Sequence, residues 1–302
     1  MSAAGYCGRF APSPTGPLHF GSLIAAVGSY LDARAAGGKW LLRMEDVDAP
    51  RNVPGAAESI LQTLSGFGFV WDGEPIWQSH RLERYRAILD ELRRRGEVYP
   101  CACSRKEVAD SAVASSVDGG LVYPGTCRNG LEPGREARAW RVRVPDAAVG
   151  FDDRVQGRVQ QVLAREVGDF VLLRADGQFA YQLAVVVDDA EAGVTHVVRG
   201  ADLIDSTPRQ IWLQQLLGLP TPSYAHLPVA TNAAGEKLSK QTLAPAVEAT
   251  AGVPLLASAM RFLGQQVAAD VERMPLPEFW RWAIAQWAIE AVPKRRGIVP
   301  SL

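Results

Sequence analysis

One stretch, residues 9–22 (RFAPSPTGPLHFGS), constrains the fold of this chain more than any other. It contains three prolines and two glycines, and this composition predicts a stiff, sharply turned loop. An apolar segment at residues 6–10 predicts a buried strand before the loop, and an unbroken apolar run at residues 23–27 predicts a helix after it. A loop between a strand and a helix N-terminus presents backbone N–H groups and the positive end of the helix dipole to an anion. The stretch therefore predicts a phosphate-binding loop.

His19 and Gly21 are the candidate functional residues within this loop. His19 can donate a hydrogen bond to a phosphate oxygen and so stabilise charge that builds up at a reacting phosphoryl group. Gly21 has no side chain, so a flat ligand can approach its backbone closely. Spacing alone leaves a second interpretation open, in which this is a proline-rich loop with a structural histidine.

The residue types at each position of the loop are more specific than the spacing of its prolines and glycines. The pattern RFAPSPTG-x-LH-x-G closely resembles the first signature of glutamyl-type class I aminoacyl-tRNA synthetases, with Ser22 in place of its final histidine. Residues 237–241 (KLSKQ) resemble the second, lysine-containing signature of the same family, although a K-x-x-K pattern alone is typical of a charged surface. The resemblance implies ATP binding by a Rossmann-like domain and formation of an aminoacyl-adenylate. It assigns catalysis to His19, Gly21, Lys237 and Lys240, and ATP binding to Pro12, His19, Gly21, Ser22, Lys237, Ser239 and Lys240.

Composition places the chain among ordinary globular proteins. Its 302 residues, 47% of them hydrophobic and 22% charged, suffice for about two domains with a sizeable core. The sequence has no apolar run long enough to span a membrane and no signal-peptide pattern, so we expect a cytoplasmic protein without a membrane partner. A monomer is the expected state, although the sequence itself does not determine it. The net charge is −1, so any contact with RNA requires a local basic patch. Residues 93–95 and 294–296 are candidates for that patch, unless they are only a solvated helix end or tail.

The candidate pocket for an amino acid combines two arginines with one glutamate. Residues 39–44 predict a strand, and Glu45 directly after it can meet an ammonium group, since ligands of open parallel sheets lie beyond the carboxyl ends of strands. Two guanidinium groups, of Arg9 and Arg199, suit a ligand with two carboxylates. The resemblance implies that glutamate is bound by Arg9, Phe10, Ala11, Pro12, Ser13, Glu45, Tyr181 and Arg199.

This pocket pattern leaves three questions open. It does not separate glutamate from aspartate, nor does it show which arginine takes which carboxylate. Full-length members of the family usually have asparagine at the position of Val185, so a polar contact is missing there. The effect of that departure on amino-acid affinity is not fixed by the sequence.

Three of the four cysteines lie close together in the chain, at Cys101, Cys103 and Cys127. Clustered thiols in a cytoplasmic protein indicate zinc, although free thiols near a water molecule or Asp110 are an alternative. The C-x-C…Y-x-x-x-C spacing resembles the zinc site in a shortened, glutamyl-Q branch of the synthetase family, which implies that Tyr123 is the fourth ligand. A site with four protein ligands would be structural, with one Zn²⁺ per chain. Cys7, in the first predicted strand, is expected to be a buried thiol.

Helices and strands alternate along the rest of the chain. We expect helices over residues 22–35, 55–64, 79–96, 206–218, 255–262 and 277–289, with Ser79 as an N-cap. Strands are expected over residues 39–44, 140–144, 195–198 and 224–229, with a hairpin turn at residues 176–177 and a turn at residues 151–153. The predicted fold class is α/β, a Rossmann-like parallel sheet with a zinc-containing insertion and a short helical C-terminal region.

This fold class divides the chain into four segments. Residues 1–98 and 166–242 are expected to form the two halves of the catalytic domain, and residues 99–165 the insertion, an acceptor-type subdomain. Residues 243–302 are expected to form the helical C-terminal region, without an anticodon-binding domain.

The full resemblance implies an enzyme that activates L-glutamate with ATP and Mg²⁺. Members of the glutamyl-Q branch attach glutamate to the modified base queuosine in the anticodon loop of tRNA(Asp), so that loop is the expected partner. Two alternatives stay open. One is a minimal glutamyl-tRNA synthetase that charges a 3′ end, and the other is a non-catalytic nucleotide- or RNA-binding module.

Overall fold

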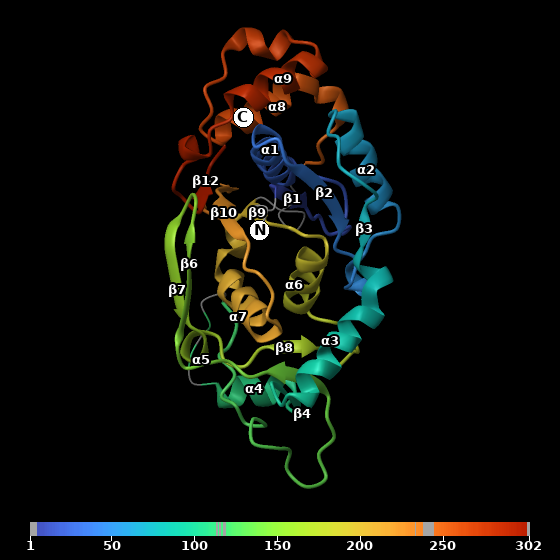
Figure 1. Ribbon diagram of the computed structural model, residues 1–302, viewed down its shortest axis with the longest axis vertical. Coiled ribbons are helices and arrows are strands. Elements are labelled where there is room, and N and C mark those ends of the chain that lie inside the picture. Colours follow the sequence, from blue (N-terminus) through green and yellow to red (C-terminus); the bar gives the residue numbers. More distant parts are fainter. Residues whose placement is uncertain are drawn as a thin grey trace.

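Helices and strands alternate through the molecule, as the sequence predicts (Figure 1). The computed structural model describes residues 5–112, 114, 116, 119–232, 234–237 and 245–300. The α-helices are α1 (Phe20–Ala35), α2 (Ala56–Gly66), α3 (Leu82–Arg94), α4 (Arg105–Ser111), α5 (Leu163–Glu166), α6 (Tyr181–Glu191), α7 (Thr207–Leu217), α8 (Gly252–Phe262) and α9 (Leu276–Gln286). The strands are β1 (Cys7–Phe10), β2 (Lys39–Met44), β3 (Ile76–Trp77), β4 (Val98–Cys101), β5 (Ala139–Val142), β6 (Ala148–Asp153), β7 (Gly157–Val162), β8 (Val171–Leu173), β9 (His196–Gly200), β10 (Ser223–Leu227), β11 (Val229–Ala230) and β12 (Gly297–Ile298). Within these ranges, no helix has the length and apolar character that a membrane crossing requires.

Parallel strands form the centre of the molecule. β1 pairs with β2, β2 with β3, and β9 with β10. The starts of β1 and β9 lie side by side, since the backbone N–H of Thr195 donates to the carbonyl of Cys7 over 2.9 Å. The order of the strands in space is therefore β3-β2-β1-β9-β10. From the boundary between β1 and β9, the strand order continues to β2 and β3 on one side and to β10 on the other. In open α/β sheets, ligands bind beyond the carboxyl ends of the strands at such a boundary.

Helices cover both faces of this sheet. One apolar cluster joins α1, α2, α8 and α9 to one face, and a second joins α3, α6 and α7 to the other. Adjacent strand residues alternate between the two clusters, with Val197 in the second and Val198 in the first. Figure 1 places α8 and α9 at one end of the elongated molecule, next to α1.

Antiparallel strands occupy the opposite end and one edge. β4, β5 and β8 form a small sheet next to α4, far from the C-terminal helices (Figure 1). The hairpin β6–β7 joins the central strands through β6, which pairs with β10. The turn expected at residues 151–153 is wrong, because these residues continue β6. Val149, Phe151 and Asp153 alternate as its buried side, and this two-residue period fixes a strand.

The expected N-cap at Ser79 is also wrong. Ser79 lies in a short 3-10 helix (Gln78–Arg81), and α3 begins after it at Leu82. The Ser79 hydroxyl donates to the Asp46 carboxylate over 2.6 Å, and its backbone N–H donates to the same group over 2.9 Å. These two bonds turn Ser79 toward Asp46, and the N-cap position of α3 is taken by Arg81, two residues further along the chain. Leu82, the first residue of α3, is 39% exposed.

Candidate active site at the carboxyl ends of the parallel strands

A cavity of about 660 Å³ opens where the carboxyl ends of β1, β2 and β9 meet. The backbone N–H of Glu45, after β2, donates to the carbonyl of Pro12, after β1, over 3.0 Å. This bond holds the two strand ends together at the cavity wall. The sequence-predicted glutamate and ATP residues that the structure describes all line the cavity: Arg9, Phe10, Ala11, Pro12, Ser13, His19, Gly21, Ser22, Glu45, Tyr181, Arg199 and Lys237.

The N-terminus of α1 forms one end of the cavity. His19 precedes the first turn of α1 with extended backbone, and its side chain is buried. Ser22 Oγ lies 3.1 Å from His19 Nε2, so this hydroxyl fixes the orientation of the imidazole ring. The first turn carries no acidic residue, and the positive end of the helix dipole therefore faces the cavity without local compensation. This end is suited to bind phosphate.

Arg199, Tyr181 and Glu45 form the opposite part of the wall. Arg199 Nη1 donates to the Tyr181 hydroxyl over 3.3 Å, while its Nη2 donates to Gln210 over 2.9 Å. Burial raises the pKa of Glu45, although Arg43 and Arg9 oppose that shift. An ammonium group bound beside Glu45 would favour its charged form and lower the pKa again.

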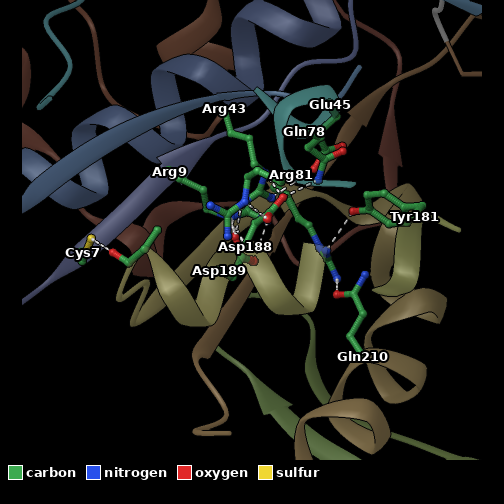
Figure 2. Close-up of polar contacts among 12 residues, drawn as sticks. Cys7, Arg9, Arg43, Glu45, Gln78, Arg81, Tyr181, Asp188, Asp189 and Gln210 are labelled. Carbon is green, nitrogen blue, oxygen red and sulfur yellow. Dashed lines mark hydrogen bonds and ion pairs between the residues drawn. The ribbon is translucent and has the colours of Figure 1, made fainter. Parts of the chain in front are cut away.

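A buried network of ion pairs lies beneath this wall (Figure 2). Asp189, on α6, accepts from Arg9 Nε over 3.2 Å and from Arg43 Nη1 over 2.5 Å. Arg43 Nη2 in turn donates to Glu45 over 3.1 Å. The Arg43 side chain is only 1% exposed, and charges buried so deeply require close partners. Asp189 thus orients Arg9 directly and Glu45 through Arg43.

Asp188 extends the network to the next helices. Its carboxylate accepts from Gln78 over 2.8 Å, from Arg81 over 2.6 Å and from the Tyr85 hydroxyl over 2.8 Å. Burial, with the nearby Asp188 charge, raises the pKa of Tyr85 and keeps it a hydrogen-bond donor. The network pairs the buried guanidinium groups of Arg9 and Arg43 with Glu45 and Asp189. The partly exposed Arg81 pairs with both Asp188 and Glu191.

Lys237, a residue of the second predicted signature, lines the cavity. Its ammonium group contacts the Asp202 carboxylate over 2.6 Å, and its backbone bridges to Thr231. The other predicted residues of this signature, Ser239 and Lys240, lie outside the described residues.

The three clustered cysteines come together at the far end of the molecule. The Sγ atoms of Cys101, Cys103 and Cys127 lie within 4.8 Å of one another. Tyr123 Oη is 3.5 Å from Cys101 Sγ and 3.6 Å from Cys103 Sγ. Four such donors can surround one metal ion, since ligands of tetrahedral zinc with bonds of about 2.3 Å lie roughly 3.7 Å apart. Cys7 is buried in β1, as expected.

Arg141 adds positive charge to this cluster. Its Nε donates to Cys101 Sγ over 3.3 Å, and its guanidinium group lies 3.8 Å from the centre of the Tyr123 ring. Burial opposes ionisation of Cys101, but hydrogen bonds from Tyr123 and Arg141 hold the pKa of its thiol below the usual range. Burial and the neighbouring thiols raise the pKa of Cys103 to about 11, so the convergence of the donor atoms, and not one thiol's pKa, is what suits the cluster to a cation.

Sequence reasoning missed the residues that support the cavity from below. Arg43, Asp189 and His226 were not predicted, and each contacts a predicted site residue: Glu45, Arg9 and Arg199 respectively. Their one sequence signal is a charged or polar side chain within an apolar strand or helix, where an isolated charge would be costly. Val185, by contrast, is buried in the second apolar cluster and is not among the described residues that line the cavity.

Comparison with known families gives a match to the catalytic domain of class I tRNA synthetases (E and Q) over residues 7–253. The chain is 63% identical to a glutamyl-Q tRNA(Asp) synthetase from Dechloromonas aromatica, over 97% of this chain and 98% of that protein. It is 62% identical to a glutamyl-Q tRNA(Asp) synthetase from Aromatoleum aromaticum, over 97% of this chain and 92% of that protein.

Solved structures with the same fold include a glutamate-tRNA synthetase from Elizabethkingia anophelis. It has a TM-score of 0.77 and 25% identity, and the match covers 96% of this chain and 67% of that one. A glutamate tRNA ligase from Elizabethkingia meningosepticum, crystallised with its amino acid, matches with the same TM-score and identity over 96% of this chain and 66% of that one. The predicted α/β fold class is confirmed.

We expect Asp189→Asn to lower the free energy of unfolding by about 3–5 kcal/mol, because the buried guanidinium groups of Arg9 and Arg43 lose their shared counter-charge. Chemical denaturation at pH 7 measures this loss. Asp176→Asn is the matched control, since Asp176 forms an exposed pair with Arg174 and its loss should cost less than about 1 kcal/mol. Equal losses for the two variants would contradict the expectation.

Proposed function

This chain belongs to the family of glutamyl-Q tRNA(Asp) synthetases, and from this premise we propose that it activates L-glutamate with ATP and transfers the glutamyl group to tRNA(Asp). The observation that carries the proposal is one cavity with a helix N-terminus at one end and two arginines with a glutamate, 10% exposed, at the other. The acceptor is the queuosine base in the anticodon loop. A base in a single-stranded loop can be splayed out and enter a pocket.

The amino-acid end of the cavity suits a dicarboxylic ligand. Arg9 and Arg199 supply guanidinium groups for two carboxylates, and Glu45 supplies the counter-charge for the ammonium group. Tyr181 and Ser13 add hydroxyl groups to the same wall. A neutral amino acid would leave the ligand-facing edge of one guanidinium group without the second carboxylate that a dicarboxylic ligand supplies, which disfavours its binding.

The reaction needs no nucleophile from the protein. The α-carboxylate of glutamate attacks the α-phosphate of ATP, which enters as its Mg²⁺ complex, and the α–β anhydride bond breaks to release pyrophosphate. His19 and Lys237, with Lys240 assigned by the resemblance, balance the negative charge that develops at the phosphates. A hydroxyl of the acceptor base then attacks the carbonyl of the adenylate, an ester forms, and AMP leaves. Alignment of the reactants within the cavity supplies the remaining rate enhancement.

We assign the cysteine cluster to one structural Zn²⁺, held by Cys101, Cys103, Tyr123 and Cys127. Four protein ligands leave no open position for a substrate, so the ion would supply stability to the insertion and no step of the reaction. The local apolar cluster around it is small, with Tyr99 and Ala102 beside the ligands, so metal–ligand bonds would carry much of the stability there.

Three expectations from the sequence stay predictions: the segment boundaries, the monomeric state and the cytoplasmic location. A reaction on tRNA is consistent with the cytoplasm.

Labelled glutamate, ATP and two tRNA pools test the acceptor. One pool comes from cells that make queuosine, and the other from cells that cannot. We expect label on tRNA(Asp) of the first pool alone. Label at the 3′ end in both pools would instead establish a minimal glutamyl-tRNA synthetase. The absence of glutamate-dependent pyrophosphate exchange, with or without tRNA, would establish a non-catalytic module.

His19→Ala is expected to slow adenylate formation by about 10²-fold, because the transition state loses one preorganised hydrogen-bond donor. Pyrophosphate exchange with ATP and glutamate measures this rate without RNA. His80→Ala is the control, since His80 is exposed and does not line the cavity. An unchanged rate for His19→Ala would remove His19 from the mechanism.

We expect one zinc per chain in protein purified without added metal, and less than half of that in Cys103→Ser. The variant replaces a thiolate ligand with a poorer donor, so its melting temperature should also fall. Elemental analysis gives the zinc content, and Cys7→Ser, which changes a buried thiol outside the cluster, should keep it. Wild-type protein without zinc would refute the assignment.

A further inference from the structure

A chain of three buried polar side chains runs from the hairpin β6–β7 to the cavity wall. The parallel register places His226 of β10 next to Arg199 of β9, so the two side chains project from the same face of the sheet. Arg199 Nε donates to His226 Nε2 over 3.1 Å. On its other side, His226 Nδ1 lies 2.6 Å from Asp153 Oδ2 in β6. Both the His226 and Asp153 side chains are 0% exposed.

The partners of Asp153 fix the position of the proton on His226. Asp153 Oδ1 accepts three backbone N–H groups, of Val155, Gln156 and His226, over 2.9–3.0 Å. Oδ2 faces the imidazole, and a carboxylate oxygen only accepts, so His226 carries its proton on Nδ1. Burial, opposed by the hydrogen bond to Asp153, lowers the pKa of His226 to about 4, so the ring is neutral. Nε2 is therefore a lone-pair acceptor for Arg199.

This acceptor determines how Arg199 meets a ligand. Arg199 Nη2 donates to Thr207 over 2.8 Å and to Gln210 over 2.9 Å. Since Nε donates to His226, both Nε and Nη2 of the guanidinium group have partners within the protein. The Nη1 edge lies at Tyr181, a residue of the cavity wall, and is the edge that a carboxylate can reach.

We propose that Asp153 and His226 are positioning residues, which fix the Nδ1–H tautomer and thereby hold Arg199 with its Nη1 edge toward a carboxylate of the amino-acid substrate. This inference rests on the proposed function for the identity of that carboxylate. The tautomer itself does not depend on the substrate.

A one-atom change, Asp153→Asn, tests the relay. The three backbone donors require an oxygen at the Oδ1 position, so the new amide nitrogen must take the Oδ2 position and donate to His226 Nδ1. The imidazole proton then moves to Nε2 and faces the N–H of Arg199. The new Nε2–H can turn to Thr207 Oγ1, 3.2 Å away, but Arg199 Nε loses its acceptor. A buried donor without an acceptor corresponds to a change of about 10- to 100-fold in an equilibrium constant.

Pyrophosphate exchange at varied glutamate and ATP is the kinetic readout. We expect Asp153→Asn to raise the KM for glutamate by about 10- to 100-fold, the factor for one unsatisfied buried donor, and to leave the KM for ATP within about twofold. Asp169→Asn is the matched control, because Asp169 is a buried carboxylate that also accepts from an arginine, a tyrosine and a backbone N–H, and it does not line the cavity. A general loss of stability would affect both variants alike, so only a selective rise in the KM for glutamate supports the relay.

Two substitutions of His226 separate the acceptor from the ring. In His226→Gln the amide oxygen can accept from Arg199 whatever residue 153 is, so the double variant with Asp153→Asn should be no worse than His226→Gln alone. His226→Asn keeps a donor for Asp153 but does not reach Arg199, and should raise the KM for glutamate as Asp153→Asn does. Additive effects in the double variant would overturn the relay.

Imidazole ¹⁵N spectra provide a readout without substrate. The chain has four histidines, and His226 should show the Nδ1–H tautomer in the wild type and the Nε2–H tautomer in Asp153→Asn. A wild-type Nε2–H tautomer, or a switch of tautomer without a change in the KM for glutamate, would overturn the inference. A wild type that shows the expected tautomer but does not activate glutamate would refute the proposed function, and with it the carboxylate that Arg199 is proposed to meet.

Discussion

The cavity depends on two adjacent carboxylates, of Asp188 and Asp189, buried on one helix. A helix places consecutive residues about 100° apart, so the two groups reach in different directions from α6. Asp189 binds the arginines of β1 and β2. Asp188 binds Arg81, which precedes α3, and Tyr85 within α3. In a medium of low dielectric constant these pairs favour one arrangement strongly over others. The two strands that end at the cavity are thereby fixed to the helix beneath them.

The order of the parallel strands explains why so few residues suffice to build the site. The chain leaves β1 for β2 on one side and returns to its other side as β9, so three strand ends and one helix N-terminus converge. Phosphate binding can then rely on backbone groups and the dipole of α1. Charged side chains are left for the amino acid, and the strand ends present Arg9, Glu45 and Arg199 to it.

Local patterns predicted most of the elements, because strand and helix periods, prolines and glycines act over a few residues. The strand before Glu45, β2, and the helix with a proline in its first turn, α7, were predicted in this way. Long-range partners were not predicted. Arg9 and Asp189 are 180 residues apart, and Asp153 and His226 are 73 apart, so no local pattern links them. Ser79 failed as a helix cap for the same reason, since its partner Asp46 is 33 residues away.

The packing of α1 has a consequence for dividing this molecule into fragments. The family match ends at residue 253, within the first turn of α8. Yet α8 and α9 share one apolar cluster with α1, and Trp280 of α9 donates to the carbonyl of Phe67 over 2.9 Å. A fragment that stops at the family boundary would expose the apolar side of α1, the helix whose N-terminus forms the phosphate end of the cavity. The boundary of sequence similarity is therefore not a folding boundary, and the C-terminal helices belong to the smallest unit that can hold the cavity in shape.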